Sequence, residues 1–136
     1  MNRILALDVG DRRIGISMTD PMQIIASPFS VIDRKVSKNV YNEITDIVKN
    51  YSIETIVVGM PITLKGKNSH QTNAVKEFID ELSRKTSTNI ETIDERLSSV
   101  SAQKELVKKG VKTGHNKGEI DKTAATLILQ EYLASK

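Results

Sequence analysis

The chain has 136 residues, a formal net charge of +3 at pH 7 and 38% hydrophobic residues, which is typical of one globular domain spanning residues 1–136. It contains no cysteine, so disulfide frameworks, thiolate metal sites and cysteine nucleophiles are excluded. No apolar run approaches the roughly 20 residues of a membrane span, and no signal-peptide pattern opens the chain. We therefore expect a cytoplasmic protein that has no membrane partner.

The first part of the sequence predicts three β-strands in an antiparallel meander. Residues 4–9 form an apolar run broken only by Asp8, and residues 14–19 alternate apolar with small or polar side chains. The residues between these two strands can form a hairpin turn. A third strand is expected within residues 24–32, after Pro28.

The pattern then changes to alternating helices and strands. Apolar side chains at helical spacing predict four helices, over residues 36–51, 75–82, 100–107 and 120–133, and a basic loop over residues 110–117. Short β-rich runs predict parallel strands over residues 53–58 and 90–94. The order β-β-β-α-β-α-β-α-α predicts an α/β fold with a five-stranded mixed sheet, in which three antiparallel strands are followed by two parallel ones and helices cover both faces. Right-handed crossovers would place the first strand in the centre, beside the fourth.

Asp8 interrupts a strand that is predicted to be central, where an unpaired carboxylate is unfavourable. One interpretation is a charge-paired or turn-facing residue at the end of the strand. The other is a metal or phosphate site, because open α/β sheets bind ligands at the C-terminal ends of their strands. Gly10 and Gly15 suit this second interpretation, since glycine lets the backbone approach a site closely.

Two further acids complete a candidate site. Glu95 follows the fifth predicted strand, where it can also be ordinary surface charge, and Asp121 lies in the first turn of the last helix, where an acid commonly compensates the helix dipole. Asp8, Glu95 and Asp121 can converge on one edge of the sheet, and three carboxylates so close would repel unless a cation neutralised them. All-oxygen ligation selects Mg²⁺ or Mn²⁺, and such a site can hold two ions that promote phosphodiester cleavage.

Positive charge is concentrated in one stretch near these acids. Residues 104–117 carry five lysines and one glutamate, a net charge of +4 that exceeds the +3 of the whole chain. This stretch can be a solvated helix face followed by a loop, or a surface that contacts backbone phosphates. Arg12 and Arg96 can stabilise charge on a scissile phosphate. The candidate nucleic-acid-binding lysines of the stretch are Lys104, Lys108, Lys109, Lys112 and Lys117.

Four collinear segments resemble the YqgF family. They are LALDVGDRRIGIS at residues 5–17, VVGMP at 57–61, DERL at 94–97 and IDKTAATLIL at 120–129. The family is described either as Holliday junction resolvases or as pre-16S ribosomal RNA nucleases. The resemblance implies a ribonuclease H-like fold, and the metal-binding acids of the family match Asp8, Glu95 and Asp121.

Two positions depart from the pattern of that family. Ser98 and Ser99 stand where the family usually has two threonines, a change that keeps the hydroxyl and capping chemistry. Lys65 precedes Gly66 where the family usually carries an acid, which argues against a metal-binding loop at this place. Lys65 is instead a candidate phosphate contact.

The sequence therefore favours a Mg²⁺- or Mn²⁺-dependent nuclease that acts on structured nucleic acid. The resemblance implies either the 5′ end of a ribosomal RNA precursor or a four-way DNA junction as substrate. We favour the RNA, because a resolvase requires a symmetric dimer and the sequence indicates no dimer interface; we expect a monomer or a weak homodimer. Two alternatives are a non-catalytic RNA-binding module on the same fold and an ATPase of the actin and sugar-kinase type. The ATPase closes two lobes on its nucleotide, and 136 residues supply one.

Overall fold

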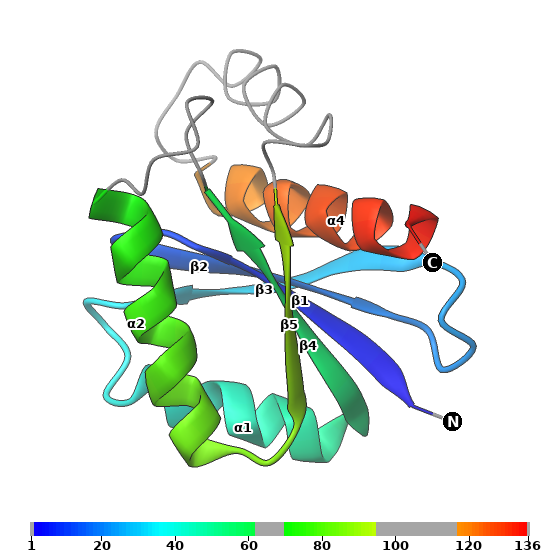
Figure 1. Cartoon of the computed structure of the whole chain (residues 1–136), viewed down its shortest axis with the longest axis horizontal. Coiled ribbons are helices and arrows are strands. Elements are labelled where there is room, and N and C mark those ends of the chain that lie inside the picture. The colour runs from blue at the N-terminus through cyan, green and yellow to red at the C-terminus, as the bar shows by residue number, and fades with distance from the viewer. Residues whose placement is uncertain (1, 62–69, 95–116, 136) are drawn as a thin grey trace.

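The computed structural model describes residues 2–61, 70–94 and 117–135 (Figure 1). Its strands form a five-stranded sheet of order β3-β2-β1-β4-β5. The strand bounds are β1 (Arg3–Val9), β2 (Arg13–Thr19), β3 (Ala26–Asp33), β4 (Ile53–Met60) and β5 (Asn89–Asp94). The pairs β1–β2 and β2–β3 are antiparallel, and the pairs β1–β4 and β4–β5 are parallel. The predicted mixed sheet, with its first strand central and beside the fourth, is confirmed.

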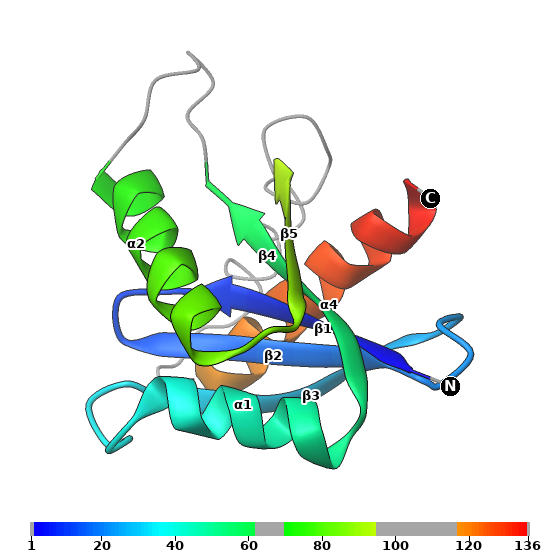
Figure 2. The same cartoon turned by 60° about the horizontal axis from the view of Figure 1, so that its bottom comes forward.

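Helices lie on both faces of this sheet, as the alternation of elements predicts. Helices α1 (Val40–Asn50) and α2 (His70–Lys85) cover one face, and α4 (Lys117–Ala134) covers the other (Figure 2). Among the helices that the structure describes, none is long and apolar enough to cross a membrane.

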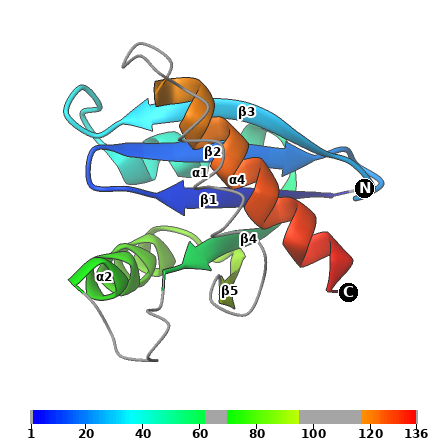
Figure 3. The ribbon, with the colours of Figure 1, turned by 90° about the horizontal axis from the view of Figure 1, so that it is seen from above.

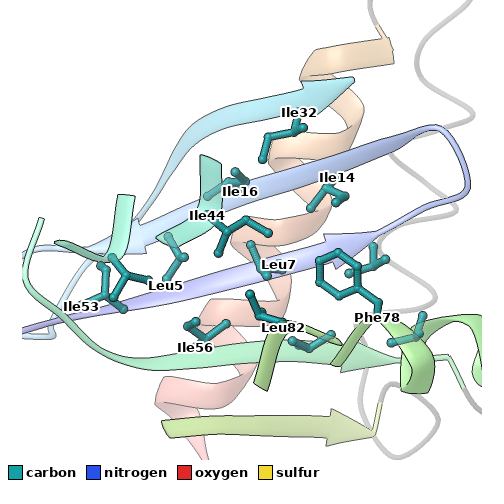
Figure 4. Close-up of a cluster of buried hydrophobic side chains, with 14 of the residues drawn as sticks. Leu5, Leu7, Ile14, Ile16, Ile32, Ile44, Ile53, Ile56, Phe78 and Leu82 are labelled. Atoms are coloured by element: carbon teal, nitrogen blue, oxygen red, sulfur yellow. The ribbon is translucent and has the colours of Figure 1, made fainter. Parts of the chain in front are cut away.

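The side chains of β1 alternate between two hydrophobic layers. Leu5, Leu7 and Val9 belong to the larger layer, which packs under α1 and α2 (Figure 4). Ile4 and Ala6 belong to the smaller layer under α4. Because successive residues of a strand point to opposite faces, the next residue of the second series faces α4 as well. That residue is Asp8, and its position follows directly from the alternation.

Helix α4 crosses the strands diagonally and is fixed to the sheet along its length (Figure 3). The buried hydroxyl of Ser17 in β2 donates a hydrogen bond to the carbonyl of Ala125 at 2.8 Å. Near the end of the helix, the Tyr132 hydroxyl donates to Glu91 Oε2 in β5 at 3.0 Å. These two bonds connect α4 to strands on either side of β1, so the start of the helix has a defined place over the sheet.

Two predicted boundaries were wrong for physical reasons. Strand β3 begins at Ala26, ahead of Pro28, because β3 is the edge strand and a residue without an N–H is tolerated there. The helix expected from residue 36 begins at Val40, since Asn39 caps it by accepting a hydrogen bond from Asn42 N–H. Val36 lies before the helix and is 78% exposed.

The last helix begins earlier than the sequence indicates. Lys117, expected in a basic loop, opens α4. The predicted helix over residues 100–107 and the rest of the basic loop lie outside the described part of the chain.

Candidate active site

Asp8 lies one residue before the C-terminal end of the central strand, at the sheet edge where a ligand was expected. It is half-buried, and its Cα partner in β2 is Gly15. Directly opposed residues of an antiparallel pair project to the same face, so Asp8 and the missing side chain of Gly15 share the α4 face. The sequence predicted that Asp8 lies at this strand end, and the register adds what lies beside it.

Gly15 is the point at which α4 meets the sheet. A Cβ atom at this position would lie 2.0 Å from the carbonyl oxygen of Asp121 and 3.2 Å from its Cα. Such distances are far below van der Waals contact, so only glycine permits this packing. The sequence suggested that Gly15 lets the backbone approach a ligand; the structure shows instead that Gly15 admits the backbone of α4 at Asp121. Asp8 and Asp121 lie on the same face of the sheet, each directly next to Gly15.

Asp121 also forms an ion pair that the sequence reasoning missed. Arg13 Nε donates to Asp121 Oδ2 at 2.6 Å, and the two side chains are 26% and 19% exposed. Arg13 is the first residue of β2 and shares the α4 face with Gly15, two residues further on. It stands inside the first family-like segment, but no local signal could connect it with a partner 108 positions away.

Strand β5 ends at the same edge of the sheet. Leu7 is level with Val58, and Val58 is level with Thr92, so Asp94 ends β5 just beyond the level of Asp8. Glu95 is the next residue along the chain and lies outside the described residues. The candidate contacts Arg96, Lys65, Lys104, Lys108, Lys109 and Lys112 lie outside them as well.

Arg12, the remaining candidate phosphate contact, is at the turn between β1 and β2. Its side chain is 54% exposed and lies 3.5 Å from Asp33 Oδ2. Asp33 is held mainly by the Lys35 N–H, and this hydrogen bond together with the charge of Arg12 lowers the pKa of the Asp33 carboxyl. An exposed ion pair as long as this one contributes little to stability, so Arg12 can exchange Asp33 for a phosphate.

A surface hollow of about 600 Å³ lies elsewhere in the molecule, against α2. Its lining includes Asp11, Arg34, Tyr41 and Glu81, with neither Asp8 nor Asp121 among the residues. Arg34 is already engaged there, since it donates to the Gly10 carbonyl at 2.8 Å and lies over the ring of Phe78. This hollow is therefore separate from the candidate site.

The donor set at this edge fits a hard divalent cation. Asp8 lies opposite Gly15 and the Asp121 backbone packs on Gly15, so both acids belong to the same end of the α4 face, and oxygen ligands are those that Mg²⁺ and Mn²⁺ prefer. Within the described residues no group of three metal-ligating side chains is gathered. A third carboxylate would have to come from Glu95, the residue after the described end of β5.

Comparison with known proteins identifies the family to which the sequence is similar. The family model described as RuvX, Holliday junction resolvase, matches residues 2–135. A protein of Desulforamulus reducens is 42% identical over 133 residues, covering 98% of this chain and 97% of its own length. A protein of Roseiflexus is 35% identical over 134 residues, covering 98% and 95%. Both relatives bear the provisional name pre-16S rRNA nuclease.

Solved structures agree on the fold. Thermus thermophilus RuvC in complex with a Holliday junction substrate superposes with a TM-score of 0.61 at 10% identity, covering 99% of this chain and 95% of that one. The fowlpox virus Holliday junction resolvase superposes with a TM-score of 0.56, also at 10% identity, covering 98% and 99%. The fold is thus that of the RuvC-like resolvases of the ribonuclease H-like class, as the resemblance implied.

Proposed function

Because this chain belongs to the RuvX family, also called the YqgF family, we propose that it is a nuclease that hydrolyses phosphodiester bonds of structured nucleic acid. The observation that carries the proposal is the placement of Asp8 and Asp121 beside Gly15 at one edge of the sheet. This placement supports a shared acidic site, in a chain that matches nuclease-named relatives over 98% of its length.

Each residue has a role that follows from its chemistry. Asp8 and Asp121, with Glu95 as a third carboxylate, would hold one or two Mg²⁺ or Mn²⁺ ions. Bound at such a site, these ions activate a water and stabilise the leaving oxygen of the phosphodiester. Arg12 is exposed at the same end of β1, where it can bind a phosphate oxygen. Arg96, Lys65 and the lysines of residues 104–117 would contact the flanking phosphates.

A ribosomal RNA precursor is the substrate that we favour. The names of the sequence relatives, at 35% and 42% identity, point to cleavage of pre-16S rRNA, and such a substrate implies action in the cytoplasm. The description of the family model and the RuvC-like fold favour a second candidate, the four-way DNA junction. A junction resolvase needs two active sites, so a monomer or weak homodimer suits the RNA substrate better.

The proposal is tested by cleavage assays with the Asp8→Asn variant. Wild type and variant are incubated with Mn²⁺ and either a pre-16S rRNA fragment or a four-way junction. Asp8→Asn keeps the size of the side chain but removes the charge that a cation requires, so we expect cleavage to fall at least about a thousandfold. A loss of one metal ligand accounts for an effect of this order, about 4 kcal/mol. Asp46→Asn, an exposed aspartate of α1, is the matched control.

The substrates and the control separate the possible outcomes. Wild-type cleavage of the RNA but not of the junction supports the favoured substrate, and the reverse preference supports the resolvase. Full cleavage by folded Asp8→Asn would contradict the catalytic role of this residue. If wild type binds RNA without Mn²⁺-dependent cleavage of either substrate, the chain is a non-catalytic RNA-binding module instead.

A further inference from the structure

Both the backbone and the side chain of Arg13 are held by specific partners. Its carbonyl accepts a hydrogen bond from Gly10 N–H at 2.9 Å, and in the ladder with β3 its Cα partner is Asp33. From this base the guanidinium reaches Asp121 at 2.6 Å, with both side chains largely covered. A short charge-assisted contact in such a place is stronger than a surface ion pair. The Arg13–Asp121 ion pair is therefore a specific contact of the folded site and not a chance surface contact.

We propose that Arg13 is the internal counter-ion of Asp121 in the metal-free protein, and that it competes with a divalent cation for this carboxylate. The proposal rests on the proposed function, because it assumes that a cation binds at Asp8 and Asp121. Arg13 is a positioning residue, since it acts through Asp121.

The direction in which Arg13 changes the metal affinity follows from the charges. In the absence of a cation, Arg13 neutralises the charge of Asp121 through their ion pair. When a divalent cation binds Asp121, the same guanidinium is a like charge beside it. A neutral partner that orients a metal ligand raises metal affinity. Arg13 instead carries a positive charge, which repels the cation, so it lowers that affinity while it stabilises the metal-free protein.

This arrangement has a consequence for the order of binding. Mg²⁺ is usually held by one or two carboxylates together with substrate phosphates. Because Arg13 weakens the site towards the cation alone, the cation is retained best when the nucleic-acid backbone adds its own negative charge. Arg13 thereby couples metal occupancy to the presence of substrate.

The test is a calorimetric titration of Mn²⁺ into protein without nucleic acid. Arg13→Gln keeps a hydrogen-bond donor but removes the charge, and we expect it to bind Mn²⁺ about tenfold more tightly than wild type. Arg13→Lys keeps the charge and should stay nearer to wild type. Arg84→Gln removes the same charge from α2, where the exposed Arg84 pairs with Glu81, and should leave the Mn²⁺ affinity unchanged.

Thermal unfolding gives a readout that a purely structural role would not produce. In the presence of a chelator, Arg13→Gln should melt below Arg84→Gln, and Mn²⁺ should raise the melting temperature of Arg13→Gln by more than that of wild type. Unchanged or weaker Mn²⁺ binding by Arg13→Gln would overturn the inference and leave the proposed function standing. If wild type binds no Mn²⁺, or if Asp121→Asn leaves its binding unaltered, the metal site itself is wrong.

A measurement on the wild-type protein covers the case in which Arg13→Gln does not fold. The Nε–H of Arg13 gives its own nuclear magnetic resonance signal, identified by its loss in Arg13→Lys. On saturation with Mg²⁺ this signal should shift and its hydrogen should exchange faster with water, since the bond to Asp121 is released. A signal that stays the same in position and exchange rate would contradict the competition.

Discussion

Gly15 is the residue on which the candidate site depends most directly. A Cβ atom there would overlap the Asp121 carbonyl at 2.0 Å, and both partners are backbone, so no side-chain rotation relieves the overlap. We expect Gly15→Ala to lower the free energy of unfolding by about 3 kcal/mol, the upper end for an overpacked core. The gain of roughly 0.5–1 kcal/mol from replacing a strand glycine is too small to offset this. Urea unfolding measures the difference.

Gly10→Ala provides the comparison for that prediction. A Cβ atom at position 10 would lie 2.8 Å from the Arg13 carbonyl oxygen, a smaller overlap that is confined to the β1–β2 turn. Gly10→Ala should therefore destabilise less than Gly15→Ala. Equal stability of Gly15→Ala and wild type would mean that α4 does not pack against β2 in this way, and the placement of Asp121 beside Asp8 would be lost with it.

Predictions for single residues were accurate where they depended on neighbouring residues in the sequence. The alternation of apolar residues in β1 placed Asp8 at the end of a central strand, and glycine at position 15 indicated a close backbone approach. The Arg13–Asp121 pair could not be predicted, because it depends on how α4 lies over β2, and the two residues are 108 positions apart. Pairs of this kind come from tertiary packing, which no local pattern encodes.

At the scale of elements, Asp20 organises the connection between β2 and β3. Its carboxylate accepts hydrogen bonds from the backbone N–H groups of Met22, Ile24 and Ile25, at 3.1, 2.9 and 2.7 Å. These bonds, with that from Ile25 the strongest, hold the pKa of Asp20 below its ordinary value of 3.8. The turn keeps Gln23 at a positive φ of 59°, so it needs such support.

We expect Asp20→Ala to loosen this connection without disturbing the sheet. Amide hydrogen exchange at Ile24 and Ile25 should accelerate, while amides of β1 should keep their protection. Because the pKa of Asp20 is lowered on folding, its contribution to stability is fully present above the ordinary pKa and is lost as the pH falls through the folded-state value. Wild type and Asp20→Ala should therefore converge in stability at low pH. A constant difference at every pH would contradict the role given to the charge.

Element types were predicted better than element boundaries. The period of the hydrophobic pattern identified the helices and the first strands, and short β-rich runs identified β4 and β5, because the hydrophobic layer on each face of the sheet selects these patterns. The start of β3 was missed because Pro28 ends an interior strand but not an edge strand. The start of α1 was missed because Val36 fits the helical spacing, whereas the Asn39 cap decides where the helix begins.

At the scale of the whole molecule, the charge is divided between the two ends of the parallel strands. The carboxyl ends of β1 and β5 carry the candidate acids, and residues 104–117, with a net charge of +4, follow β5 in the chain. Lys49 and Lys85, in the last turns of α1 and α2, lie at the opposite edge, where β4 and β5 begin. Lys49 and Lys85 are therefore described lysines away from the candidate site, and Lys108 and Lys109 are two lysines of the basic stretch that follows β5 in the chain.

Variants of Lys108 and Lys109, compared with variants of Lys49 and Lys85, test which end of the parallel strands binds nucleic acid. Each phosphate contact contributes about 0.9 to the slope of log affinity against log salt for duplex DNA, and about 0.7 for single strands. Replacing Lys108 and Lys109 by glutamine should lower that slope by about 1.4 to 1.8 and weaken binding of RNA and junction DNA alike, because phosphate contacts do not read sequence. Replacing Lys49 and Lys85 removes the same charge and should change the slope little. Fluorescence anisotropy across a range of salt concentrations, with Asp8→Asn to prevent cleavage, measures both. Equal effects of the two double variants would mean that binding follows net charge alone, and the edge that carries Asp8 and Asp121 would have no special place in it.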